Sequence, residues 1–163
     1  MFHSIYIVTT IFIAPIICIL IEFFIKHPRK EELKVLCYKW LVLWLGVRSV
    51  TAGLMQAMNP AYTARFLQLT SESHFMIQEL GCANIGMGVL AALSFKFPQL
   101  QKPAAICNSV FLTGAAFLHI QRIDMIGWDE TMSLLSDLYI IVVYVSCLLK
   151  GGRKTRIQLN CQK

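Results

Sequence analysis

Charged side chains are scarce in this chain of 163 residues, because aspartate, glutamate, lysine and arginine together make up only 15% of it. A typical soluble domain has about 25%. Hydrophobic residues supply 56% of the chain, and the mean hydropathy is +0.61. A water-soluble fold of this composition would expose large apolar patches. The scarcity of charge therefore excludes a soluble globular protein and indicates an integral membrane protein, which has the lipid bilayer as its first partner.

The sequence also lacks the short motifs of nucleotide and hydrolase chemistry. It contains no Walker A loop, no dinucleotide-binding glycine fingerprint and no GxSxG elbow. A trio of Ser133, His119 and Asp137 is possible on paper, but spans rich in polar residues supply such a trio by chance. No nucleophile or acid pair identifies a reaction, so the sequence does not predict an enzyme.

Cysteine motifs are missing as well, although six cysteines are present. None forms a CxxC pair or combines with histidine at the spacing of metal ligands. Only Cys161 lies in the tail, and the others lie in or at the ends of apolar runs, where a cysteine is usually a small hydrophobic residue. A site made of His74, Glu79 and His119 has no helical chelate spacing. We therefore expect no disulfide, no metal and no cofactor.

The apolar runs are long enough to cross a bilayer, which requires about 17 to 25 residues for each helix. This pattern predicts an all-α, polytopic bundle with five transmembrane helices in a single domain over residues 1–150, followed by a basic tail over 151–163. Between the second and third spans, residues 60–67 predict a short helix lying in the membrane interface. The predicted spans are residues 5–25, 35–58, 74–95, 104–123 and 131–149.

The net charge of +6 comes from lysines and arginines at the ends of the apolar runs, not from a stripe with interleaved aromatic residues. The pattern therefore excludes nucleic acid as a partner and is a topology signal instead. The first loop, the third loop and the tail are basic, whereas the second and fourth loops are not. Because cytoplasmic loops carry the excess of positive charge, we expect an N-terminus outside and a cytoplasmic C-terminus.

Small residues mark the predicted contact surfaces of the helices. In the second span, Gly46, Ser49 and Gly53 form an edge suited to close packing, within the chain or in a homodimer. In the third span, Gly81, Asn84 and Gly88 share one face, and a second face also consists of small and polar residues. The third helix is therefore predicted to pack on two sides at the centre of the bundle. The second face holds Glu79, Cys82, Ala83 and Gly86.

Ionisable residues inside a membrane span are costly unless they are paired or hydrated. At 1.5 Å per residue, Glu79, His119 and Asp137 fall in the same outer leaflet, and Arg48 is deeper but long enough to reach Glu79 or Asp137. The predicted cluster either binds a ligand or is an ion pair that only fixes the helix register. Its candidate members are Arg48, Glu79, His119 and Asp137, with Gln78 and Asn84.

The series Arg48-x4-Gly53, Asn59-Pro60, Glu79-x-Gly81-x-Ala83-Asn84, Gly114 and His119 resembles an uncharacterised family of small prokaryotic membrane proteins with an E-x-G-x-A-N motif. That family is similar in outline to the DoxX-like group of four-helix membrane proteins, and the resemblance covers the second to fourth spans. It implies a multi-pass protein of the bacterial inner (plasma) membrane and, in part, an association with redox or quinone-linked complexes. The motif positions that it carries over are Arg48, Glu79, Gly81, Asn84 and His119.

Two functions follow from these observations and remain open. In the first, an outward-facing polar pocket inside the membrane binds a small amphipathic or quinone-like ligand or headgroup. In the second, the chain is an accessory or assembly subunit of a larger membrane complex, and the polar cluster is purely structural. A membrane-protein partner or a homodimer fits the second function.

Overall fold

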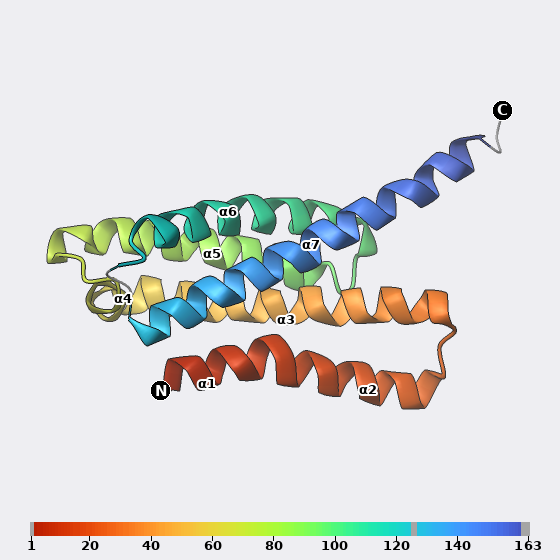
Figure 1. The fold of residues 1–163 in the computed structure, drawn as a ribbon, viewed down its shortest axis with the longest axis horizontal. Coiled ribbons are helices and arrows are strands. Elements are labelled where there is room, and N and C mark those ends of the chain that lie inside the picture. Colours follow the sequence, from red (N-terminus) through yellow and green to blue (C-terminus); the bar gives the residue numbers. More distant parts are fainter. Residues whose placement is uncertain (1, 125–126, 161–163) are drawn as a thin grey trace.

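The structure is a computed structural model that describes residues 2–124 and 127–160, and all regular secondary structure within these residues is helical (Figure 1). The prediction of an all-α protein is confirmed. Residues 161–163, at the end of the predicted tail, lie outside the described residues. The α-helices are α1 (Phe2–Val8), α2 (Ala14–Lys26), α3 (Lys30–Met58), α4 (Pro60–Phe66), α5 (His74–Leu93), α6 (Gln101–Gln121) and α7 (Trp128–Asn160).

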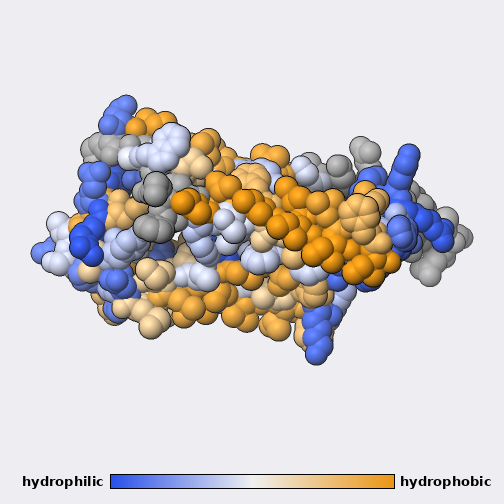
Figure 2. All heavy atoms as spheres, turned by 90° about the horizontal axis from the view of Figure 1, so that it is seen from below, coloured by the Kyte–Doolittle hydropathy of each residue, from blue (hydrophilic) through white to orange (hydrophobic). Residues whose placement is uncertain are grey.

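Four segments of the described chain are long and apolar enough to cross a membrane. They coincide with the first four predicted spans. The fifth predicted span, residues 131–149, lies within α7 and stays a prediction, as does the orientation of the bundle. Figure 2 shows apolar side chains over the middle of the molecule and hydrophilic residues at both ends, the distribution expected of a protein that sits in a bilayer. The four segments are Ile5–Lys26, Glu32–Met58, Ser71–Leu93 and Pro98–Gln121.

The first span passes through Pro15 without breaking. A proline inside an α-helix lacks an N–H donor, and its ring collides with the carbonyl group four residues earlier. Here a π-helical segment, Thr9–Ile13, lies immediately before the proline and joins α1 to α2. The wider π turn gives the ring room, so α1, the π segment and α2 form one continuous span along α3.

A carboxylate joins the other end of α2 to α3. Trp40 Nε1 donates a hydrogen bond of 2.6 Å to Glu22 Oε2, and Lys26 Nζ lies 2.6 Å from Glu22 Oε1. Lys39 Nζ lies 3.8 Å from the same carboxylate and 4.1 Å from the centre of the Phe95 ring, which follows α5. These contacts fix α2, α3 and the end of α5 together at the end of the bundle predicted to face the cytoplasm.

Glycines bring α3 and α5 into direct backbone contact. A Cβ atom placed on Gly53 would lie 2.5 Å from the carbonyl oxygen of Gly81, and one placed on Gly81 would lie 2.7 Å from that of Gly53. Gly46 and Gly88 face each other in the same way, at 2.8 and 2.7 Å. No side chain fits at these distances. The glycine edge of α3, which the sequence offered to an internal contact or to a homodimer, is thus occupied within the chain.

Only one of the two small-residue faces predicted on α5 is packed. Gly81, Asn84 and Gly88 are buried, but the opposite face is exposed. The prediction that this helix packs on two sides is wrong for the single chain, because α6 packs mainly against α7 and makes few contacts with α5. The exposed face holds Glu79, Cys82, Ala83 and Gly86.

The apolar core lies where α3, α5, α6 and α7 meet. Val42, Ala91, Ala104, Ile140 and Tyr144 are almost completely buried there, and they come from these four helices. In Figure 1, α7 runs obliquely across the bundle and reaches both α6 and the region of α1. The core therefore ties the oblique helix α7 to the α3–α5 pair.

Helix α4 confirms the predicted short helix and lies across one end of the bundle (Figure 1). Asn59 Oδ1 accepts a hydrogen bond from the Tyr62 backbone N–H at 3.3 Å, which is a typical N-cap contact. Thr63 is buried against the bundle. Arg122 Nη2 donates to the Leu67 carbonyl oxygen at 2.8 Å and so ties the end of α4 to the end of α6.

The glycine contact predicts a large difference between two neighbouring substitutions. Gly81→Ala should lower the free energy of unfolding by about 1–3 kcal/mol, because the new methyl group meets backbone atoms of α3. Gly86→Ala adds the same group where nothing lies within 4 Å, so stability should stay equal or rise by up to about 1 kcal/mol through helix propensity. Reversible unfolding in mixed micelles measures both. Equal losses for the two variants would contradict the close approach of α3 and α5.

Candidate functional site

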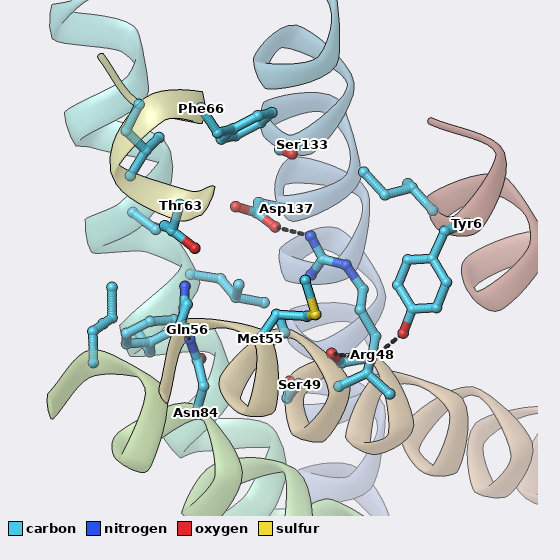
Figure 3. Close-up of a pocket in the computed structure, with 18 of the residues that line it drawn as sticks. Tyr6, Arg48, Ser49, Met55, Gln56, Thr63, Phe66, Asn84, Ser133 and Asp137 are labelled. Carbon is cyan, nitrogen blue, oxygen red and sulfur yellow. Dashed lines mark hydrogen bonds and ion pairs between the residues drawn. The ribbon is translucent and has the colours of Figure 1, made fainter. Parts of the chain in front are cut away.

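A cavity of about 480 Å³ lies at the end of the bundle beside α4 (Figure 3). Helices α1, α3, α4, α5, α6 and α7 all contribute to its lining. Most of the exposed surface of the wall is apolar, and polar side chains from all six helices interrupt it. Ligand sites in proteins commonly have this combination of shape and chemistry. The apolar part of the wall includes Met55, Phe66, Leu80, Phe111, Leu112 and Ala115.

An ion pair between α3 and α7 forms part of this wall. Arg48 Nη2 lies 3.0 Å from Asp137 Oδ1 and 2.9 Å from Ser136 Oγ, and donates a hydrogen bond to each. The two charged side chains are 15% and 7% exposed, so both are largely removed from water. Ser136 Oγ in turn donates to the Ser133 carbonyl oxygen at 2.7 Å. The carboxylate therefore compensates the guanidinium in a place where neither charge is well solvated.

A pair of side-chain amides links α3 to α5 at a second place on the wall. Asn84 Nδ2 donates to Gln56 Oε1 at 2.8 Å, and Asn84 is only 7% exposed. Figure 3 shows this pair separated from the Arg48 guanidinium by Met55. Gln78, one of the predicted site residues, lies outside the lining. It is exposed, and its Nε2 donates to the Ala57 carbonyl oxygen at 3.2 Å.

His119 lines the cavity from α6 and contacts the start of α7. Its Nδ1 lies 2.8 Å from Glu130 Oε1, and the Glu130 side chain is 2% exposed. This contact joins the end of α6 to the start of α7 beside the cavity. The partner of His119 Nδ1 is thus Glu130, and not the Asp137 of the Ser133–His119–Asp137 trio considered from the sequence.

A further contact holds α1 against the cavity from the other side. The Tyr6 hydroxyl group and Thr51 Oγ1 form a hydrogen bond between α1 and α3, and both residues line the cavity. Thr51 Oγ1 also lies 2.9 Å from the Arg48 carbonyl oxygen. The N-terminal span is thus part of the site and does not serve only as an anchor.

The structure brings together four of the six predicted site residues and leaves two outside. Arg48, Asn84, His119 and Asp137 line one cavity, whereas Gln78 and Glu79 do not. The placement of Glu79 follows from helix geometry. It precedes Asn84 by five positions, which places it about 140° around α5, so when Asn84 faces α3 the carboxylate points away and is exposed. Among the described residues, the carboxylate that meets Arg48 is that of Asp137.

Several residues of this site were not predicted from the sequence. For some of them, the spacing along a helix could have indicated that they belong to it. Gln56 lies eight residues after Arg48, close to the same face of α3. Glu130, Ser133 and Asp137 follow the i, i+3, i+7 spacing of one helix face, but the predicted span began at residue 131 and left Glu130 in a loop. Tyr6 carried no signal, because its role depends on how α1 packs.

The arrangement is suited to binding. It offers hydrogen-bond donors and acceptors at separate points inside an apolar enclosure. Within the part of the chain that the structure describes, no group of three or more histidine, cysteine, aspartate or glutamate side chains is placed to hold a metal ion. The polar groups that the described lining offers are the ion pair, the amides, the imidazole and the hydroxyl groups.

Comparison with known protein families identifies the family of the chain but assigns it no activity. Residues 5–156 match a family of unknown function, DUF6790. The match covers most of the chain, so the protein belongs to this family. No curated protein and no solved structure matches it.

The ion pair predicts strong coupling between Arg48 and Asp137. Arg48→Met or Asp137→Leu alone should lower the free energy of unfolding by about 3–5 kcal/mol, because each leaves an uncompensated charge in an apolar place. The double variant should recover most of that loss. Unfolding titrations in lipid–detergent micelles give the four values of the cycle.

Glu79→Gln is the matched control. Because this carboxylate is exposed, the substitution should change the free energy of unfolding by no more than about 0.5 kcal/mol. If the losses of the two single variants simply add in the double variant, the two charges do not interact.

Proposed function

We propose that this member of a family of unknown function binds a small amphipathic molecule in the cavity beside α4. The observation that carries the proposal is an apolar cavity of about 480 Å³ with an ion pair in its wall. Binding sites for small molecules commonly have volumes of about 300–1,000 Å³ and a few polar groups that orient the ligand. A molecule with an apolar body and a polar head matches this wall.

The predicted orientation indicates the side of the membrane to which the cavity opens. The basic loops lie at the opposite end of the bundle from α4, so by the positive-inside rule the cavity opens toward the non-cytoplasmic side of a bacterial inner membrane. An amphipathic ligand reaches such a site from the outer leaflet. This placement also fits the resemblance to DoxX-like proteins, some of which are associated with quinone-linked complexes, and quinone-like molecules belong to the proposed ligand class.

A second candidate function is an accessory role in a larger membrane complex. The observation that favours it is the exposed face of α5, where Glu79 lies on a span beside Cys82, Ala83 and Gly86. Small residues allow another helix to approach closely, and a carboxylate at this depth gains from a donor on a neighbour. The ion pair would then serve only to hold α3 against α7.

A cavity-filling variant separates the two functions. Ala115 lines the cavity from α6, whereas its neighbour Gly114 is exposed, and a Cβ atom placed on it would have nothing within 4 Å. Ala115→Phe should remove a co-purifying small molecule, with a decrease of about tenfold, which corresponds to a loss of about 1.4 kcal/mol in binding. Gly114→Phe should leave it in place. Mass spectrometry of extracts from protein in native nanodiscs measures the amount, and thermal unfolding checks that both variants fold.

The same small-molecule profile in the wild-type protein and in a folded Ala115→Phe variant would contradict ligand binding in this cavity. Loss of a co-purifying protein in Glu79→Leu, with no change in Ala115→Phe, would support the accessory role instead.

A further inference from the structure

The guanidinium of Arg48 has unused hydrogen-bond donors at the cavity. An arginine side chain carries five N–H groups. Its bonds to Ser136 and Asp137 both come from Nη2 and use the two N–H groups of that atom. For the three N–H groups on Nε and Nη1, the structure shows no acceptor among the described residues. A ligand in the cavity can therefore accept hydrogen bonds from Arg48 without disturbing its ion pair.

The charges around the cavity cancel. Arg48 is the basic residue and Asp137 the acidic residue of the lining, and they form a pair at 3.0 Å. The remaining lining group that could become positive is His119, and Glu130 lies 2.8 Å from it. Glu130 does not itself line the cavity. Among the described residues, the charged side chains of the lining therefore form one pair with no net charge to offer a charged ligand.

A charged headgroup would disturb this balance in an apolar place. An anion on the unused N–H groups of Arg48 shares one guanidinium with Asp137, so one buried negative charge has no counterion. A cation that binds Asp137 likewise leaves one buried positive charge without a counterion. An uncharged oxygen acceptor, such as a ketone, ester or amide carbonyl group, avoids both penalties because it uses the free N–H groups and leaves the pair intact.

From this balance we infer that the ligand of the cavity is an uncharged amphiphile with a carbonyl-type oxygen that accepts hydrogen bonds from Arg48. This inference rests on the proposed function. It excludes anionic headgroups as ligands, although an arginine in a membrane pocket would otherwise suggest them. The amide pair of Asn84 and Gln56 supplies a second polar point on the wall, on the far side of Met55 (Figure 3). A second oxygen on the ligand would find hydrogen-bonding groups there.

Three probes of equal size and different charge test the inference. They are para-hexylacetophenone, para-hexylbenzoate and para-hexylbenzylammonium, and the protein is the full chain in phosphatidylcholine nanodiscs, whose lipid has no net charge. Specific binding is the binding to the wild-type protein minus the binding to Ala115→Phe, which corrects for partition into the lipid. The ketone should bind at least about tenfold more tightly than the benzoate or the ammonium probe.

Asp137→Asn adds an independent measurement. It leaves the Arg48 charge uncompensated, so the benzoate should gain affinity and overtake the ketone. If this variant does not fold, the ranking in the wild-type protein still decides the question.

The outcomes separate the inference from the proposed function. Equal or tighter specific binding of either charged probe overturns the inference and leaves the cavity as a binding site. If no probe binds the wild-type protein more than Ala115→Phe, both the inference and the proposed function fail for this class of ligand. Tighter binding of the ketone with a reversed ranking in Asp137→Asn supports both.

Discussion

A guanidinium among apolar helices requires a counterion, and in this bundle the counterion comes from a helix at the other end of the chain. Arg48 on α3 meets Asp137 on α7 at 3.0 Å, with both side chains largely buried. Because either charge alone would be poorly solvated, the pair fixes where α7 can lie on α3. The position of α7 in turn places Glu130 beside His119 and closes one wall of the cavity. The pair is therefore a contact on which one wall of the site depends.

The glycines of α3 and α5 provide the second constraint. Gly53 against Gly81 and Gly46 against Gly88 bring the two backbones into direct contact. This contact leaves Asn84 facing Gln56 across the interface, and it leaves the other side of α5 without a neighbour among the described residues. The close packing of α3 against α5, which forms one wall of the cavity, therefore leaves Glu79 exposed.

Much of the fold could be predicted from the sequence, because bilayer thickness and hydrophobic run length together determine the spans. The glycine faces and the short helix after Asn59 were equally accessible, since small residues and an N-cap with proline have local signatures. The site was harder to predict. Counting residues placed Glu79, His119 and Asp137 at a similar depth, with Arg48 deeper but within reach. Depth, however, does not give the direction of a side chain around its helix. That is why Glu79 was grouped with the cluster, and why Tyr6, whose place depends on long-range packing, was missed.

The distance between the Arg48 guanidinium and the Asp137 carboxylate is the most direct test of the ion pair on which one wall of the site depends. Rotational-echo solid-state NMR on the protein in lipid bilayers, with ¹⁵N-labelled arginine and ¹³C-labelled aspartate, measures the coupling between the two groups. We expect strong dephasing, consistent with an N–O separation of 3.0 Å, and its loss in Asp137→Asn. A spectrum without arginine–aspartate dephasing in the folded wild-type protein would contradict the ion pair and the cavity wall that rests on it.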